Sequence, residues 1–287
     1  MAVILSGKEV VEQKKIDIRR RVQQLKSNGV QPTLDIAMVG DREDSLAYIK
    51  GAHKALDSCG IECRVSSYPE TITIGHFIGE IQKKNNDDSV HGIIIMRPLP
   101  GSLDWKMVEE TLSPAKDVDC ITPSNLAGVF SGLRDVFYPC TAQAVIDILD
   151  YYHIDLKGKN VAVVGRSMVV GKPVSMMLLQ RDATVTISHS KTADLEKVVS
   201  AADIVVAAAG KPGLVKDRHV KQGAVVIDVG INFVEGRLVG DVDFDSVEMK
   251  ASMITPVPGG VGSVTTGVLM EHIAAAAENI CINVKKI

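Results

Sequence analysis

Two glycines, Gly165 and Gly171, bracket a loop with the composition of a phosphate-binding turn. The short apolar run Asn160–Val164 before them is typical of a buried strand, and Pro173 suits the first turn of a helix. In a strand–loop–helix unit, backbone N–H groups at the helix start can bind a phosphate, and glycine lets the backbone approach it closely. The spacing is G-x5-G and not G-x-G-x-x-G, so an ordinary strand–helix turn is the alternative interpretation.

The residues after the next predicted strand, Ala183–Ile187, indicate which dinucleotide this loop would hold. In NAD enzymes, a carboxylate near the end of that strand binds the ribose 2′-hydroxyl. Here the first carboxylate is Asp194, and Ser190 and Lys191 come before it. Together with Arg166, these residues offer a hydroxyl and two cations, which suit the 2′-phosphate of NADP. The sequence therefore favours NADP, without settling NADP against NAD.

Two later predicted strands also end in small residues. Asp203–Ala207 is followed by Ala208–Gly210, and Ala224–Val229 is followed by Gly230. Small residues at strand ends leave room for a bound nucleotide, and ordinary tight turns are the alternative. For His189, a role in cofactor binding and a role in packing or capping remain equally open.

The first half of the chain alternates strand-like and helix-like segments in the same way. The predicted elements are a strand, a helix, a strand, a helix and a strand over Thr33–Val39, Ser45–Cys59, Ile61–Ser67, Ile74–Lys84 and Val90–Met96. A loop-rich stretch over Ser113–Pro139 precedes a helix over Thr141–Tyr152 that we expect Thr141 to cap, and Thr266–Asn279 is a final helix. This alternation predicts an α/β protein with parallel sheets.

The composition excludes several classes of protein. The length of 287 residues suits two domains or one large one. A net charge of −3, no basic block and 4% aromatic residues argue against a nucleic-acid partner. No apolar run reaches the roughly 20 residues that span a bilayer, and the first ten residues lack the features of a signal peptide. We therefore expect a cytosolic protein with no membrane partner.

The cysteines give no metal-binding pattern. Their number is odd and their spacing is scattered, so we expect reduced structural thiols and no metal site at Cys59, Cys63, Cys120, Cys140 and Cys281.

Several runs together resemble the methylenetetrahydrofolate dehydrogenase/cyclohydrolase family. In the second half they are VVGRSMVVGKP (163–173), ATVTISHSKT (183–192), IDVGIN (227–232), GDVDF (240–244) and TPVPGGVG (255–262). In the first half they are DSLAYI (44–49), MRPLPG (96–101), KDVDC (116–120) and DVFYPCT (135–141). The resemblance covers nearly the whole chain and keeps the order of the motifs.

The resemblance implies a fold, a reaction and an assembly. It implies two α/β domains that flank a cleft: a folate-binding catalytic domain of residues 1–139 plus 271–287, and a Rossmann-type NADP-binding domain of residues 140–270. The family oxidises 5,10-methylenetetrahydrofolate to the methenyl form with NADP in one-carbon metabolism. Most members then hydrolyse the methenyl form to 10-formyltetrahydrofolate, and the usual assembly is a homodimer.

The resemblance also assigns roles to residues. Those that match the cofactor positions are Gly165, Arg166, Ser167, Ser190 and Ile231. Tyr48 matches the tyrosine that stacks on the folate, and Asp119 matches the acid that hydrogen-bonds the pterin, so these two are the candidate catalytic residues. Pro258, Gly259 and Gly260 match a loop that lines the folate pocket.

Two positions depart from the family pattern in a way that bears on chemistry. The family has a lysine four residues after the stacking tyrosine, but this chain has Ala52. Lys50, His53 and Lys54 lie about 140° to 240° around a helix from Tyr48, so none of them can replace that lysine.

The second departure is Met96, which stands where the family has a glutamine that hydrogen-bonds the missing lysine. Methionine cannot donate a hydrogen bond, so both members of a catalytic pair are absent together. An inward turn of Arg97 is one way to replace the lost cation. Further along, Cys120-Ile121-Thr122 replaces the usual Gly-Phe-His, and Ser263-Val264 replaces Pro-Met.

These departures divide the expected activities. Hydride transfer needs close contact between two ligands, whereas hydrolysis needs a water activated and protons moved. We therefore expect dehydrogenase activity with weak or absent cyclohydrolase activity. The alternatives are a fully bifunctional enzyme and a non-catalytic folate- or nucleotide-binding protein.

Overall fold

The computed structural model describes residues 1–284, with side chains for all of these except residues 44 and 282–284. The chain forms two compact units. Unit 1 comprises residues 1–13, 129–133 and 139–268, and unit 2 comprises residues 14–128, 134–138 and the chain from residue 269 onward. The predicted α/β fold with parallel sheets is confirmed. The predicted boundaries of the folate-binding and NADP-binding domains stay a prediction.

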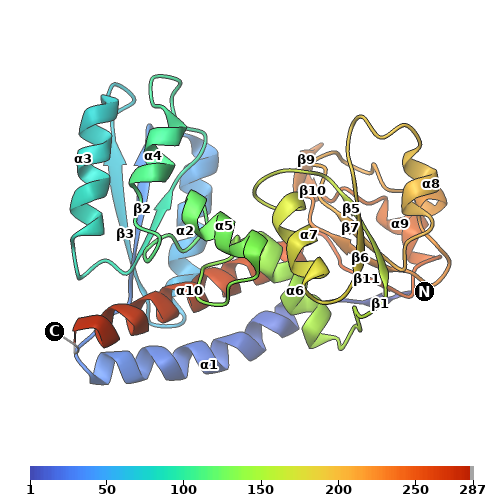
Figure 1. Ribbon diagram of the computed structural model, residues 1–287, viewed down its shortest axis with the longest axis horizontal. Helices are drawn as coiled ribbons and strands as arrows, with labels where there is room; N and C mark the ends of the chain where they lie inside the picture. The colour runs from blue at the N-terminus through green and yellow to red at the C-terminus, as the bar shows by residue number, and fades with distance from the viewer. Residues whose placement is uncertain (285–287) are drawn as a thin grey trace. The chain divides into compact units, whose positions relative to one another are not determined.

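Unit 1 is built on a six-stranded sheet in the order β1-β11-β8-β7-β5-β6, in which all neighbouring strands are parallel (Figure 1). The bounds are Val3–Ile4 for β1, Asn160–Val164 for β5, Thr184–Ser188 for β6, Ile204–Ala207 for β7, Val225–Asp228 for β8 and Met253–Ile254 for β11. From β5 the chain passes to β6 on one side and then to β7 on the other. The strand order therefore reverses between β5 and β7.

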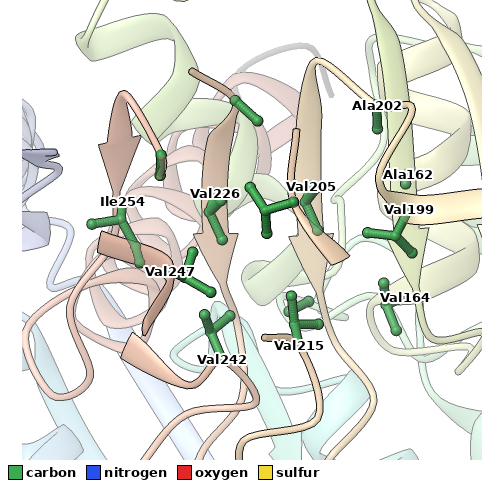
Figure 2. Packing of buried hydrophobic residues seen from close by; sticks show 14 of the residues in the cluster. Ala162, Val164, Val199, Ala202, Val205, Val215, Val226, Val242, Val247 and Ile254 are labelled. Carbon is green, nitrogen blue, oxygen red and sulfur yellow. The ribbon is translucent and has the colours of Figure 1, made fainter. Parts of the chain in front are cut away.

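The central strands β5, β7 and β8 of the unit 1 sheet are buried on both faces, whereas the edge strands β1 and β6 are largely exposed. Ala162, Val205, Val226 and Ile254 occupy one row of the register, and Figure 2 shows their side chains on the face where helices α8 and α9 pack. Val161 and Val163, which alternate with these along β5, are equally buried. This explains the continuous apolar runs in the sequence, because a parallel sheet that is covered on both faces has no polar side.

The helices of unit 1 connect consecutive strands. Their bounds are Cys140–Tyr151 for α6, Gly171–Leu179 for α7, Leu195–Val199 for α8 and Phe244–Glu248 for α9, with a 3₁₀ turn over Asp217–His219. A hairpin of β9 (Asn232–Val234) and β10 (Arg237–Val239) follows β8.

Unit 2 contains a three-stranded parallel sheet in the order β3-β2-β4. The strands are Glu62–Tyr68, Thr33–Val39 and Gly92–Ile95, and the helices are Glu43–Asp57 for α2, Ile74–Asn85 for α3 and Trp105–Thr111 for α4. Helix α5 (Pro123–Ser131) is divided, with residues 123–128 in unit 2 and residues 129–131 in unit 1. The long helices α1 (Gly7–Ser27) and α10 (Val261–Val284) each contribute residues to both units. Within unit 2, Arg21 of α1 donates two hydrogen bonds to the Glu278 carboxylate of α10, at 2.9 and 2.7 Å.

Two local expectations were wrong. Helix α6 begins at Cys140 and has Pro139 at its N-cap, so Thr141 lies inside the first turn and does not cap it. The stretch expected to be loop-rich contains α5, which begins at Pro123, a residue suited to a first helical turn. Within residues 1–284, none of the helices combines the length and the apolar character that crossing a membrane requires.

Candidate functional site

The residues assigned to the cofactor lie along one edge of the unit 1 sheet. Gly165, Arg166 and Ser167 follow β5, Ser190 follows β6, and Ile231 follows β8. Because all these strands are parallel, their carboxyl ends share this edge. It includes the point where the strand order reverses, which is where open α/β sheets bind nucleotides.

The loop after β5 has no room for side chains at its two glycines. Gly165 has φ +135°, and a Cβ there would lie 2.0 Å from the carbonyl oxygen of Ala208. A Cβ on Gly171 would lie 2.3 Å from the carbonyl oxygen of Gly165. The G-x5-G spacing therefore reflects the close packing of three backbone segments: the end of β5, the start of α7 and the turn after β7.

Four consecutive amides in this loop are available to a ligand. Within residues 1–284, the backbone N–H groups of residues 166–169 donate to no protein acceptor. The next two amides, of Val170 and Gly171, donate to the hydroxyl oxygen of Ser167 at 3.1 and 3.4 Å. Residues 166–169 directly precede Val170, the N-cap of the nine-residue helix α7, and unpaired amides beside a helix N-terminus can bind an anion such as a pyrophosphate.

The turn after β6 presents the side chains expected to meet a 2′-phosphate. Val164 pairs with Ser188, so Arg166 and Ser190 each lie two residues beyond a paired position. Ser190 and Lys191 are exposed, as is Arg166. The ring of His189 accepts a hydrogen bond from the N–H of Lys191 at 3.1 Å, so this histidine caps its own turn.

The turn after β7 is closed by the carboxylate of Asp241, to which the sequence motifs assign no role. The N–H groups of Ala209, Gly210 and Lys211 donate to the side chain of Asp241 at 2.6, 2.8 and 2.8 Å. Asp241 is fully buried. These three amides are therefore already paired, unlike those of residues 166–169, and are not available to a ligand.

Unit 1 also contains the loop assigned to the folate pocket. The carbonyl oxygen of Gly259 accepts a hydrogen bond from the N–H of Gly7 at 2.8 Å, and a Cβ on Gly260 would lie 2.5 Å from the carbonyl oxygen of Pro256. A Cβ on Gly262 would lie 3.2 Å from Cδ1 of Ile231. The glycine-rich loop over residues 258–260 thus leads into the start of α10, which packs against Ile231, a residue assigned to the cofactor.

The other assigned residues belong to unit 2. Tyr48 lies on α2, which follows the end of β2, and Met96 directly follows β4, with its N–H donating to the carbonyl of Ala37 at 2.9 Å. Asp119 follows a segment that runs beside β4, because the N–H of Ile93 donates to the carbonyl of Lys116 at 2.8 Å. The carboxyl ends of β2 and β4 therefore position this second group.

Tyr48 and Ala52 both lie on α2, but they differ in how much of each is exposed to solvent. Tyr48 is 46% exposed, whereas Ala52 is 5% exposed and belongs with Ser45, Ile49 and Leu56 to the buried side of the helix. Lys50, His53 and Lys54 are all exposed. Arg97 lies elsewhere, with its guanidinium 5.2 Å from the centre of the Trp105 ring, so it stacks on an aromatic face.

The loop that carries Asp119 is held by Asp117, which is completely buried. Its carboxylate accepts hydrogen bonds from the N–H of Ile121 at 2.9 Å, the N–H and hydroxyl of Thr122 at 2.8 and 2.7 Å, and the amide of Asn125 at 2.9 Å. Four such bonds offset the cost of burying a charge. On the other side of Asp119, Nδ1 of His272 lies 2.9 Å from the carbonyl oxygen of Val118.

Cys120 takes an unusual backbone conformation next to Asp119. Its φ is +56°, a region that favours glycine, and its side chain is 4% exposed. Burial, and then the negative charges of Asp117 and Asp119, raise the pKa of the Cys120 thiol far above its usual range. This thiol therefore stays protonated and is a poor nucleophile.

Two family profiles match consecutive parts of the chain. The profile described as "Tetrahydrofolate dehydrogenase/cyclohydrolase, catalytic domain" matches residues 5–119. The profile described as "Tetrahydrofolate dehydrogenase/cyclohydrolase, NAD(P)-binding domain" matches residues 139–281. The second match contains every residue assigned to the cofactor.

Relatives and solved structures are similar to this chain over almost their full length. The chain is 46% identical to "Bifunctional protein FolD" of Alkaliphilus metalliredigens, over 97% of this chain and 98% of the relative. It superposes on the bifunctional FolD of Campylobacter jejuni with a TM-score of 0.95 at 41% identity, covering 97% and 99% of the two chains. It superposes on the Trypanosoma brucei dehydrogenase-cyclohydrolase, which is complexed with NADP cofactor and an inhibitor, with a TM-score of 0.91 at 36% identity, covering 97% and 98%.

The packing around Gly171 leads to a stability prediction. We expect Gly171→Ala to lower the free energy of unfolding by about 1–3 kcal/mol, because the new methyl group would meet backbone atoms that cannot rotate away. The matched control is Gly79→Ala inside α3, where a Cβ would meet nothing within 4 Å. Thermal unfolding followed by circular dichroism compares the two. Equal midpoints would contradict the packing argument.

Proposed function

Because the chain belongs to the tetrahydrofolate dehydrogenase/cyclohydrolase family, we propose that it oxidises 5,10-methylenetetrahydrofolate to 5,10-methenyltetrahydrofolate with NADP. The observation that carries this proposal is the row of unpaired amides at residues 166–169, beside the exposed Arg166 and Ser190. The amides suit the pyrophosphate, and the hydroxyl and guanidinium suit a 2′-phosphate. In this reaction the substrate's methylene carbon loses a hydride to the nicotinamide ring, and the folate is left as the methenyl cation.

The folate has its own set of residues in this proposal. Tyr48 stacks on the pterin, Asp119 hydrogen-bonds it, and Pro258, Gly259 and Gly260 line the pocket. The support for Asp119 is the loop around it, which is held by the buried carboxylate of Asp117 on one side and by His272 on the other. Residues 1–139 plus 271–287 form the folate-binding domain and residues 140–270 form the NADP-binding domain.

The second proposal is that cyclohydrolase activity is weak or absent. Ala52 and Met96 offer neither a cation nor a hydrogen-bond donor at the two positions where the family pattern has lysine and glutamine. The nearby charged residues of α2 are exposed, and Arg97 is stacked on Trp105. Hydride transfer needs no proton relay from the protein, whereas hydrolysis does, so only the second activity suffers.

Two alternatives remain in view. A fully bifunctional enzyme is favoured by the names of the relatives, which are called bifunctional. A non-catalytic binding protein would keep the nucleotide loop without reducing NADP.

The dehydrogenase proposal is tested by following NADP reduction with methylenetetrahydrofolate, and NAD reduction in parallel. We expect wild-type protein to prefer NADP, and Arg166→Ala to raise the KM for NADP by about 10- to 100-fold with little change for NAD, because only NADP carries the 2′-phosphate. Arg218→Ala is the control, since Arg218 is exposed and lies before β8, away from this edge. No reduction of either cofactor by wild-type protein would favour the binding protein.

The hydrolytic proposal has a direct assay. Methenyltetrahydrofolate is added to the protein and its decay is compared with the spontaneous rate. We expect no acceleration by wild-type protein, and acceleration by the double variant Ala52→Lys/Met96→Gln, which restores a cation and an amide. Each single variant serves as a control, because the pair acts together. Clear acceleration by the wild-type protein would establish the bifunctional alternative.

We also propose a homodimer, with the β9–β10 hairpin at its interface. Each strand has three residues, and such a short isolated hairpin is marginally stable by itself. Its apolar side chains are exposed, with Phe233 at 75% and Leu238 at 41%. Exposed apolar patches of this kind mark association surfaces.

Sedimentation equilibrium tests the assembly. We expect a dimer for the wild-type protein and a shift to monomer for Phe233→Lys/Leu238→Lys, because lysine ammonium groups cannot be buried without a partner. Phe130→Lys is the control, since Phe130 is 73% exposed on α5. A monomeric wild-type protein would reject the dimer, and a dimeric double variant would exclude the hairpin as its interface.

A further inference from the structure

Two buried aspartates connect the turns at the cofactor edge of unit 1. Asp228 is the last residue of β8 and is 4% exposed. Its Oδ1 accepts hydrogen bonds from the N–H groups of Gly230 and Asp241, each at 2.9 Å, and its Oδ2 accepts one from the N–H of Val242 at 3.0 Å. Asp228 thereby fixes the backbone on both sides of Ile231 and of the β9–β10 hairpin.

Asp241 extends this connection to the turn after β7. Besides the three amides of residues 209–211, its carboxylate accepts a hydrogen bond from the side-chain amide of Asn232 at 2.9 Å. Asn232 directly follows Ile231, and the turn after β7 begins with Ala208, which packs against Gly165. One carboxylate thus joins two of the segments that face the cofactor.

The space around the two carboxylates is filled by backbone. A Cβ on Gly230 would lie 2.4 Å from Cγ of Asp241, and a Cβ on Gly240 would lie 1.8 Å from Oδ2 of Asp228. Each aspartate therefore rests against a glycine of the other's segment. Neither carboxylate can shift without moving the chain next to it.

We propose that Asp241, held in place by Asp228, is a positioning residue for dinucleotide binding. It sets the turn after β7 and the backbone at Ile231 in the arrangement that the cofactor meets, and it contacts no cofactor itself. This inference rests on the proposed function only in that the ligand is NADP. Asp228 and Asp241 are not among the residues to which the family resemblance assigns a role.

The hydrogen bonds to the two carboxylates support a holding role. Burial raises the pKa of Asp228 to about 6, and its hydrogen bonds from the N–H groups of Asp241, Val242 and Gly230 oppose that rise. Asp241 accepts four hydrogen bonds, three from backbone amides and one from Asn232. A buried carboxylate is costly unless donors surround it, so the position of Asp241 and the positions of its four donors depend on each other.

The test uses Asp241→Asn, which keeps the shape of the side chain but turns one acceptor oxygen into an NH2 group facing backbone donors. The control is Asp243→Asn two residues later, where the carboxylate caps no helix N–H. NADP is titrated into each full-length protein by isothermal calorimetry, which gives the dissociation constant and the number of sites separately. The KM for methylenetetrahydrofolate is then measured at saturating NADP.

We expect Asp241→Asn to raise the NADP dissociation constant at least tenfold, with the folate KM changed less than twofold and the control unchanged. A purely structural role would reduce the number of sites or the melting temperature and leave the dissociation constant of the folded protein as it was, and that result would overturn the proposal. If Asp241→Asn does not fold, Asn232→Ala takes its place, because it removes one hydrogen-bond donor to Asp241. We expect Asn232→Ala to raise the NADP dissociation constant about threefold. A dissociation constant within 1.5-fold of the wild-type value would overturn the proposal equally. Wild-type protein that binds no NADP would instead reject the proposed function.

Discussion

At the carboxyl edge of the unit 1 sheet, three backbone segments pack so closely that no side chain fits between them. The carbonyl of Ala208 occupies the place of a Cβ on Gly165, and the carbonyl of Gly165 occupies the place of a Cβ on Gly171. This contact fixes where α7 starts and leaves no space for a side chain at either end of the loop that contains the amides of residues 166–169. The same contact sets the positions of the exposed Arg166 and Ser190 and of the turn closed by Asp241, because these follow the same strand or adjoining strands.

Both units hold a functional loop with a buried aspartate. Asp241 binds backbone amides of the turn after β7, and Asp117 binds backbone amides after Asp119. In each case the carboxylate is fully buried and accepts four hydrogen bonds, which offset the cost of removing its oxygens from water. Each of these carboxylates therefore fixes the backbone of the loop whose amides it binds.

Much of this arrangement could be predicted from the sequence, because it depends on periodicity. The strands Thr33–Val39 and Asn160–Val164 were predicted with the observed bounds, since continuous apolar runs between turn signals are typical of buried parallel strands. The loop between Gly165 and Gly171 was predicted because only glycine permits such close backbone contact. Pro173 also lies in the first turn of α7, as predicted.

Other features depend on contacts between residues that are distant in the chain, and single-sequence patterns do not carry those. The motifs over 227–232 and 240–244 were visible, but the bonds between Asp228 and Asp241 that join them were not. The hairpin β9–β10 was missed because its three-residue strands are too short to show alternation. Thr141 has a capping side chain, yet Pro139 two residues earlier set the start of α6.

The first strand of the molecule has a consequence for how the chain is made. Among the described residues, Val3 and Ile4 of β1 pair with Met253 and Ile254 of β11, 250 positions later in the sequence. During synthesis β1 therefore has no partner strand until β11 has emerged. Completion of the unit 1 sheet at this edge depends on a contact of very high sequence separation, which is formed late in folding.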